Sequence, residues 1–380
     1  MGVKIFMKMT PPMGWNSWNT FGRDINEQLI FDMAEKIEAL GLKDLGYNYI
    51  VIDDCWSKKL RNKDGRLEPD TDKFPNGMKA VADKLHSMGF KFGMYGCSGT
   101  LTCDGYPGSF EHEYTDAATF AEWGVDFLKY DYCFHSNLIH GKYLYRRMAL
   151  ALKNCGRDIL FSACTWGKDD TEKWIRETGA NMWRSTPDVF DTWESVKKII
   201  DAQSNIFAYG GAGCFNDMDM LTVGMRGKGN VGLEGLNDDQ YKLHFSVWAL
   251  LGSPLFIGAD LREADEATLE ILKNKEVIEI NQDPDCRQIM ELQPLWAPQI
   301  KAYSRYLSNG DIAVGFFNLS EKEQLLRYEF EELGIPESTG KTLMMRDVWT
   351  KEERKLENCS IWHNMKPYET LLLRCRVIDK

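Results

Sequence analysis

The most constraining feature of the sequence is an alternation of short β-rich runs with longer amphipathic segments over roughly the first 290 residues. It predicts strands at residues 13–15, 47–53, 91–95, 125–131, 159–164, 180–184, 206–210 and 254–258. Because parallel strands need crossover connections, which helices supply, this alternation indicates an α/β fold with a parallel sheet. Eight strands fit a closed (β/α)8 TIM barrel better than an open sheet, so we expect a barrel over residues 1–290.

The pattern changes after Asn281-Gln282-Asp283-Pro284. Strand-like runs then follow one another with few long helical patterns between them, at residues 300–307, 312–318, 324–329, 340–347 and 369–377. The Ser308-Asn309-Gly310 turn is typical of a hairpin. A chain of 380 residues also exceeds what one core usually supports. We therefore expect a C-terminal antiparallel β-sandwich domain over residues 291–380.

Composition and spacing exclude several classes of function. The formal net charge is −11, which disfavours nucleic acid as a partner, and no apolar run reaches the ~18 residues of a membrane span. The 10 Cys contain no CxxC pair and the 6 His no HxH or HExxH spacing, so we predict no metal site. Residues 1–10 lack the apolar core of a signal peptide. A cytoplasmic protein is expected, or a secreted or periplasmic one if a leader was removed.

Carboxylates cluster where a barrel places its active site, at the C-terminal ends of the predicted strands. They are Asp53, Asp54, Asp131, Asp188, Asp217 and Asp219. Aromatic side chains and a thiol stand at the same ends, at Trp15, Trp18, Trp56, Tyr95, Tyr132, Cys133, Trp166 and Trp183. Carboxylates among flat aromatic rings suit a sugar ligand. Any one of these aspartates also fits a helix N-cap or a loop ion pair.

Two of these aspartates have a nearby cation. Lys129 and Asp131 stand two residues apart, so on a strand they share a face, and the lysine favours an ionised Asp131. Asp188 follows Arg184 by four residues and is placed to donate a proton, with a pKa raised by the neighbouring negative charge. Two aspartates with separated pKa values are what glycoside hydrolysis requires.

Several short sequence motifs relate this hypothesis to a known enzyme family. The sequence contains Met13-Gly14-Trp15-Asn16-Ser17-Trp18, Ile52-Asp53-Asp54-Cys55-Trp56, Phe74-Pro75-Asn76-Gly77-Met78, Thr102-Cys103, Pro107-Gly108-Ser109, Lys129-Tyr130-Asp131 and Asn216-Asp217-Met218-Asp219-Met220-Leu221. In this order they resemble glycoside hydrolase family 27, which comprises α-galactosidases (melibiases) and α-N-acetylgalactosaminidases. The resemblance extends through Ser253-Pro254-Leu255 and Asn281-Gln282-Asp283 to Arg346-Asp347-Val348-Trp349, over nearly the whole chain.

The resemblance implies a barrel followed by an antiparallel β domain, and a retaining double displacement without a metal or organic cofactor. It implies Asp131 as the nucleophile and Asp188 as the acid/base. Asp53 and Asp54 would hold the 4- and 6-hydroxyls of galactose, with Trp18 and Lys129. The remaining substrate-binding residues that it implies are Tyr95, Cys103, Cys133, Cys164, Thr165, Trp166, Arg184 and Asp219.

The sequence departs from the family pattern at several positions. The family often pairs the cysteine at Cys55 with one shortly after the first tryptophans, and that stretch here reads Phe21-Gly22-Arg23. Cys103 and Cys133 match the family's other pair, so the resemblance implies that they approach each other or form a disulfide. Pro187 and Met218 replace a usual Gly and Pro, and neither change removes a catalytic group.

Release of terminal α-linked galactose is the function that the resemblance favours. The family position matching Thr165 lies near the sugar's 2-substituent and is commonly Glu in animal galactosidases and Ser in the N-acetylgalactosaminidases. Thr165 is smaller than Glu and uncharged, so it obstructs a 2-acetamido group less. The long side chain of Lys168 can fill the room that this leaves near the 2-substituent. An α-N-acetylgalactosaminidase, or dual specificity, is therefore the alternative. A non-catalytic sugar-binding protein and a metal-dependent isomerase are weaker alternatives, since both aspartates are present and suitable His or Glu ligand pairs are not.

Overall fold

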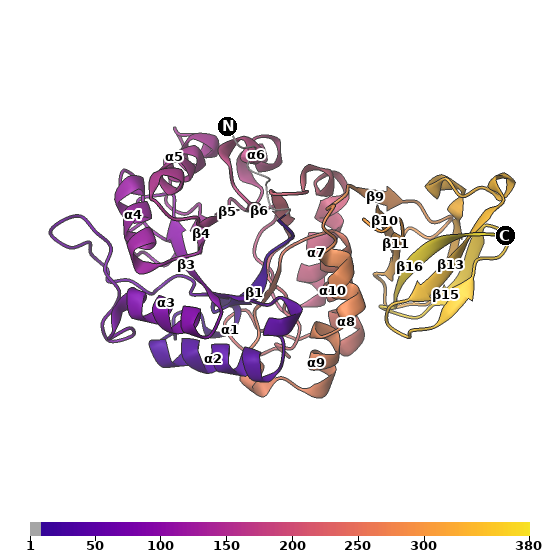
Figure 1. Ribbon diagram of the computed structural model, residues 1–380, viewed down its shortest axis with the longest axis horizontal. Coiled ribbons are helices and arrows are strands. Elements are labelled where there is room, and N and C mark those ends of the chain that lie inside the picture. The colour runs from indigo at the N-terminus through magenta and orange to yellow at the C-terminus, as the bar shows by residue number, and fades with distance from the viewer. Residues whose placement is uncertain (1–8) are drawn as a thin grey trace.

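The computed structural model describes residues 9–380, and its larger part is a barrel of eight parallel strands surrounded by helices (Figure 1). The strands are β1 (Met13–Asn16), β2 (Tyr49–Val51), β3 (Lys91–Cys97), β4 (Phe127–Asp131), β5 (Leu160–Cys164), β6 (Met182–Arg184), β7 (Phe215–Asp217) and β8 (Leu255–Ile257). Their order in the sheet is β7-β6-β5-β4-β3-β2-β1-β8. The predicted (β/α)8 architecture is confirmed.

The barrel closes between β7 and β8 by way of the segment that follows β7. The N–H of Leu221 donates to the carbonyl of Phe256 at 2.7 Å, and the N–H of Gly258 donates to the carbonyl of Leu221 at 2.9 Å. β1 pairs in parallel with both β2 and β8, which completes the ring. The C-terminal ends of all eight strands therefore face one end of the barrel.

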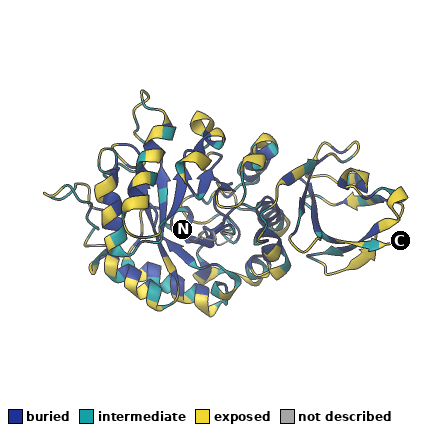
Figure 2. Ribbon diagram, turned by 45° about the horizontal axis from the view of Figure 1, so that its top comes forward, coloured by how far each residue is buried: buried dark blue, intermediate teal, exposed yellow. Residues whose placement is uncertain are grey.

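Helices cover the outside of the barrel, with buried inner faces and exposed outer faces (Figure 2). They are α1 (Trp18–Phe21), α2 (Glu27–Ala39), α3 (Gly77–Ser87), α4 (Glu113–Trp123), α5 (Gly141–Asn154), α6 (Ile175–Thr178), α7 (Trp193–Ala202), α8 (Asp238–Leu250), α9 (Glu266–Leu272) and α10 (Lys275–Asn281). Short 3-10 turns are η1 (Lys43–Leu45), η2 (Lys168–Lys173), η3 (Gln203–Asn205), η4 (Phe207–Tyr209) and η5 (Leu261–Glu263). Side-chain caps start several helices. Asn237 and Gln240, for example, form a capping box at α8.

One predicted strand is wrong. Within residues 206–210 the chain forms the 3-10 turn η4 (Phe207–Tyr209), and the seventh strand is Phe215–Asp217. The apolar run Ile206–Tyr209 has strand-like composition, but Phe207 is used for packing against Tyr303, with ring centroids 6.0 Å apart. Asp217 consequently ends the seventh strand instead of following it at a distance.

The C-terminal domain is antiparallel, as predicted. Its strands are β9 (Ile289–Leu292), β10 (Ile300–Tyr306), β11 (Ile312–Asn318), β12 (Gln324–Glu329), β13 (Lys341–Asp347), β14 (Glu353–Lys355), β15 (Ser360–Met365) and β16 (Thr370–Asp379), with turns η6 (Phe330–Leu333) and η7 (Glu337–Thr339). Six strands pair in the order β14-β13-β16-β11-β10-β9, and β12 pairs with β15. The prediction missed β9, β14 and β15. β14 is exposed throughout, so it carries no alternating apolar pattern.

The two domains meet along α8 and α10, which lie between the barrel and the β domain in Figure 1. Nearly every residue of α8 is buried, because one side of this helix faces the barrel and the other faces the β domain. Arg346 pairs with Glu276 of α10 at 2.9 Å. The division at residue 290 stays a prediction, with α10 ending at Asn281 and β9 beginning at Ile289.

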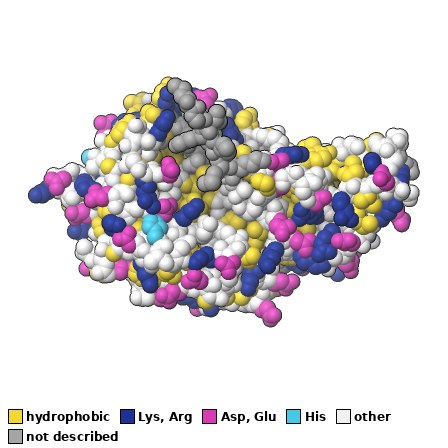
Figure 3. Space-filling view, in the orientation of Figure 1, with side chains coloured by type: hydrophobic (Ala, Val, Ile, Leu, Met, Phe, Trp, Pro, Cys, Tyr) yellow, Lys and Arg dark blue, Asp and Glu magenta, His cyan; other side chains and the backbone are white. Residues whose placement is uncertain are grey.

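The remaining expectations concern membrane spans, surface charge and cellular location. Among the described residues, the structure contains no helix that is both long and apolar enough to cross a membrane. On the face shown in Figure 3, lysine and arginine side chains are interspersed with acidic ones. The localisation expectation depends on the first ten residues, of which 1–8 lie outside the described part of the chain.

Candidate active site

A cavity of about 430 Å³ opens at the C-terminal ends of the barrel strands. Its wall consists of Trp18, Asn19, Asp53, Asp54, Tyr95, Cys103, Lys129, Asp131, Trp166, Arg184, Asp188, Asp219, Met220 and Val231. Eleven of these side chains were predicted as site residues from the sequence. They come from loops and strand ends around most of the barrel, so the closed ring of strands brings them together.

Asp131 lies at the end of β4 and is 5% exposed. Its Oδ1 accepts the N–H of Tyr132 at 2.9 Å, and its Oδ2 accepts the hydroxyl of Tyr95 at 2.9 Å. These two donors fix the carboxylate while leaving lone pairs free. Burial, together with the negative charge of Asp188, raises the pKa of Asp131 to about 6, against the opposing charge of Lys129.

Lys129 bonds to a different aspartate from the one predicted. Its Nζ lies 2.8 Å from Oδ2 of Asp53, which also accepts the amide of Asn16 at 2.8 Å. Asp53 and Lys129 therefore form a buried ion pair in the floor of the cavity. Lys129 still lowers the pKa of Asp131 through space, which is the effect predicted from their shared face.

Arg184, at the end of β6, is buried and holds two carboxylates. Its Nη2 lies 2.8 Å from Oδ1 of Asp188 and 2.6 Å from Oδ2 of Asp219. Burial opposes ionisation of Asp188, but the positive charges of Arg184 and Lys129 lower its pKa overall. The expectation that a negative neighbour raises the pKa of Asp188 is wrong, because Arg184 and Lys129 lower this pKa and outweigh the opposing effect of burial.

The predicted pairing of Cys103 with Cys133 is confirmed as a disulfide, with Cα atoms 5.2 Å apart. It joins the loops after β3 and β4. A Cβ at Gly99 would lie 1.9 Å from the carbonyl oxygen of Cys133, so only glycine allows this approach. Cys103, Asp131 and Cys133 are also a group of possible metal-ligating side chains among the described residues, but the disulfide removes both thiolates.

Three predicted residues lie outside the cavity wall. Cys133 stands behind Cys103 in the disulfide, and Cys164 lines a deeper cavity inside the barrel. Thr165 is fully buried, and its hydroxyl bonds to Thr171 at 2.5 Å. Trp166, the next residue, lines the wall instead, and Nζ of Lys168 lies 4.9 Å from its ring centroid.

Three wall residues were not predicted. Asn19 follows Trp18 directly, and its position in the first motif is the signal that sequence reasoning could have used. Met220 follows Asp219 within the seventh-strand motif. Val231 comes from a distant loop and reaches the site because its N–H donates to the carbonyl of Asn19 at 3.0 Å. A lone valine in a loop carries no sequence signal for a site.

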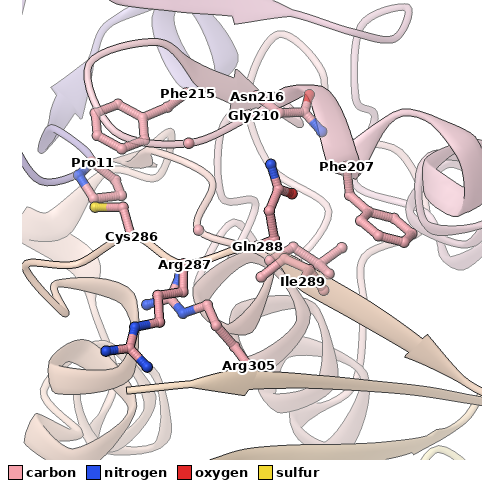
Figure 4. Close-up of a pocket in the computed structure, with 13 residues that line it drawn as sticks. Pro11, Phe207, Gly210, Phe215, Asn216, Cys286, Arg287, Gln288, Ile289 and Arg305 are labelled. Carbon is pink, nitrogen blue, oxygen red and sulfur yellow. The ribbon is translucent and has the colours of Figure 1, made fainter. Parts of the chain in front are cut away.

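A second cavity, of about 310 Å³, lies at the opposite end of the barrel beside the β domain (Figure 4). Residues just before β1 and β8 and at the start of β7 contribute to it, including Pro11, Gly252 and Phe215. Arg305 lies in its wall and donates to the carbonyl of Ile280 at the end of α10. Among the described residues no carboxylate lines it, so it offers no acid or nucleophile for glycoside chemistry.

Comparison with known proteins agrees with this geometry. The family model for α-galactosidase A matches residues 10–283, and the model for the α-galactosidase C-terminal β-sandwich domain matches residues 298–375. α-Galactosidase 3 of Arabidopsis thaliana is 42% identical over 345 residues, which are 90% of this chain and 76% of the relative.

Solved structures are similar over the full length. α-Galactosidase I of Mortierella vinacea superposes with a TM-score of 0.90 at 33% identity, covering 98% of both chains. An α-galactosidase of Saccharomyces cerevisiae, solved with raffinose, gives a TM-score of 0.87 at 31% identity, covering 97% of this chain and 98% of that one. With its barrel, its β-sandwich and its ring of strand-end aspartates, the chain belongs to the melibiase family of α-galactosidases, glycoside hydrolase family 27.

Proposed function

We propose that this protein is a retaining α-galactosidase that releases terminal α-linked galactose from oligosaccharides or glycoconjugates. The observation that carries the proposal is the placement of Asp131 and Asp188 in one cavity with Asp53, Asp54 and two tryptophans. Galactoside hydrolysis by relatives supports it, since the Saccharomyces cerevisiae α-galactosidase was solved with raffinose, an oligosaccharide.

The first step forms a covalent glycosyl-enzyme. An oxygen of Asp131 attacks the anomeric carbon, and the bond from that carbon to the glycosidic oxygen breaks as Asp188 donates its proton to this oxygen. The alcohol then leaves. Tyr95 and Tyr132 hold the Asp131 carboxylate in a fixed orientation throughout, so little reorganisation is needed before attack.

The second step returns the enzyme to its starting state. Asp188, now a carboxylate, removes a proton from water, and the water oxygen attacks the same carbon and displaces Asp131. Two inversions give net retention. Arg184 stabilises Asp188 in this ionised state, which is the state required of a base. Asp53 and Asp54 are placed to accept hydrogen bonds from sugar hydroxyls.

Proton NMR of the first product tests the function. An aryl α-galactoside incubated with the protein should release aryl alcohol and the α-anomer of galactose first, with the same rate in the presence of a chelator. A β-anomer in the initial product would overturn the retaining mechanism. No release at all would favour a non-catalytic sugar-binding protein, and loss of activity with chelator would favour a metal-dependent enzyme.

We expect kcat/KM to follow a bell-shaped pH profile with its maximum below about pH 6. Turnover needs one proton on the Asp131–Asp188 pair, located on Asp188. Because the pKa of Asp131 is about 6 in the free enzyme, the last proton leaves the pair as the pH rises through that value, and activity falls. At lower pH a second proton binds, Asp131 becomes neutral, and activity falls again. A flat profile between pH 4 and 9 would contradict this two-carboxylate assignment.

The second candidate substrate is an α-N-acetylgalactosaminide. Thr165 is smaller than glutamate, is fully buried with its hydroxyl bonded to Thr171, and directly precedes Trp166 of the cavity wall. Nζ of Lys168 lies 4.9 Å from the ring centroid of Trp166, and we infer that this side chain restricts the room for a 2-acetamido group. We therefore expect the aryl α-galactoside to have the higher kcat/KM, with the acetamido sugar disfavoured by ~10–200-fold, the range for a small steric difference in a pocket.

The ratio of kcat/KM for the two aryl glycosides measures this preference. Thr165→Glu should increase the preference for galactose further. Lys168→Ala should reduce it, because it removes the side chain that occupies the space near Trp166. A wild-type ratio that favours the acetamido sugar would reverse our order of the two substrates.

A further inference from the structure

The loop after β3 contains a carboxylate, Asp104, to which the mechanism above assigns no role. Its side chain is 12% exposed. Its Oδ1 accepts Nη2 of Arg23 at 2.6 Å, and its Oδ2 accepts Nε of Arg23 at 2.7 Å and the thiol of Cys55 at 2.8 Å. Arg23 follows β1 and Cys55 follows β2, so one carboxylate connects three neighbouring loops at the mouth of the site.

This connection stands where the resemblance implies a covalent one. Similar sequences often pair the cysteine at Cys55 with a cysteine in the stretch that here reads Phe21-Gly22-Arg23. In this chain Cys55 is a free thiol, and Arg23 reaches Asp104 instead. Burial raises the pKa of Cys55, which keeps the thiol protonated and able to donate. Asp104 thus joins noncovalently the loops that such a disulfide would join.

The backbone of Asp104 also contacts the sugar site. Its N–H donates to Oδ2 of Asp54 at 3.2 Å, and the hydroxyl of Thr102 in the same loop bonds to the Asp54 carboxyl. Asp54 is 2% exposed and lines the cavity. Burial raises the pKa of Asp54, and three donors oppose that effect by favouring the ionised form: the N–H of Cys55, which lies 2.7 Å from Oδ1, the hydroxyl of Thr102 and the N–H of Asp104. The loop after β3 supplies two of these three donors, so its position contributes to both the charge and the orientation of Asp54.

We propose that Asp104 is a positioning residue for sugar recognition, and that its carboxylate, held by Arg23 and Cys55, places the N–H that orients Asp54. Under the proposed function, on which this inference rests, Asp54 receives a hydrogen bond from the 4- or 6-hydroxyl of galactose. If the N–H of Asp104 moves away, the Asp54 carboxylate keeps the N–H of Cys55 and the hydroxyl of Thr102 but loses a donor on Oδ2, so its orientation is less well fixed before the sugar binds.

Calorimetric dissociation constants for D-galactose, 4-deoxy-D-galactose and 6-deoxy-D-galactose test this role. In Asp104→Ala the Kd for galactose should rise about tenfold, the size of one hydrogen bond to a charged group. The rise should be smaller for whichever deoxy sugar lacks the hydroxyl that Asp54 holds. A general loss of folding would raise the Kd of all three sugars equally. A smaller rise for one deoxy sugar therefore distinguishes positioning of Asp54 from a merely structural effect.

Two further variants complete the design. Arg23→Ala removes a side chain that is 73% exposed and should give the same pattern more weakly. Lys58→Ala breaks an exposed ion pair with Glu68 in the loop after β2, without contact to Asp54, and should leave all three constants unchanged. Equal rises for the three sugars, or no rise in either Asp104→Ala or Arg23→Ala, would overturn the inference. Absence of aryl α-galactoside hydrolysis by the wild-type protein would instead overturn the proposed function.

Discussion

Replacing Asp131 with asparagine should reduce kcat for an aryl α-galactoside by at least about 10⁴-fold. The amide keeps the volume of the carboxylate but cannot attack the anomeric carbon, so no glycosyl-enzyme forms. It can still accept a hydrogen bond from Tyr95 or Tyr132, so the fold should survive. The measurement is the initial rate of aryl alcohol release at saturating substrate, with thermal unfolding to check that the variant is folded.

Asp126→Asn is the matched control for this prediction. Asp126 directly precedes β4, at the opposite end of the strand from Asp131, and pairs with Arg157 and His86. Its replacement should lower stability modestly and leave kcat within a few-fold of the wild type. An Asp131→Asn protein with ordinary turnover would end the assignment of the nucleophile. Azide added to Asp131→Gly should yield a β-galactosyl azide, because the external nucleophile then attacks from the side that Asp131 occupied.

The strands were predictable wherever a buried apolar run was bounded by turn residues. β4 and β5 satisfy this condition, since both are almost fully buried between the barrel interior and its helices. Residues 206–210 are similarly apolar in sequence, yet none of them is buried and Phe207–Tyr209 form a 3-10 turn. The competing use of Phe207, which packs against Tyr303 of the β domain, is a long-range contact that a local pattern does not contain.

Most of the cavity wall was predictable, because the recognisable motifs lie at the C-terminal ends of the strands that form the wall. The remaining differences are matters of geometry. Motif matching places Thr165 beside the sugar, but Thr165 is fully buried outside the cavity wall and its hydroxyl bonds to Thr171. Spacing pairs Lys129 with Asp131, but in the folded chain Asp53 is the carboxylate that lies 2.8 Å from its ammonium.

The order of the pKa values of Asp131 and Asp188, the two proposed catalytic aspartates, was also beyond the sequence. Like charge between two aspartates was expected to keep Asp188 protonated. In the structure Arg184 lies 2.8 Å from Asp188 and lowers its pKa, whereas burial raises the pKa of Asp131 to about 6. These directions favour a proton on Asp131 over one on Asp188, whereas the proposed mechanism requires the proton on Asp188. Replacing Asp188 therefore tests its role as the proton donor.

Replacing Asp188 with alanine should have an effect that depends on the leaving group. Loss of the proton donor should lower kcat/KM by about 10²–10⁴-fold for an oligosaccharide such as raffinose, whose alkoxide leaves poorly without a proton. For an aryl α-galactoside with an acidic phenol the loss in kcat/KM should be much smaller, because that leaving group departs as the anion. The glycosyl-enzyme should then accumulate, since no base activates water, and a burst of aryl alcohol should precede a slow steady state.

The pH profile and an added nucleophile check the same variant independently. The fall in kcat/KM above about pH 6 should disappear in Asp188→Ala, because the alkaline limb reports loss of the proton that Asp188 donates. Azide needs no base, so it should accelerate the slow step and give an α-galactosyl azide, with the configuration opposite to that expected from Asp131→Gly. Equal losses for raffinose and the aryl substrate, with the alkaline limb retained, would show that Asp188 only shapes the pocket. In that case the acid would have to be sought at Asp219, the other carboxylate that Arg184 holds.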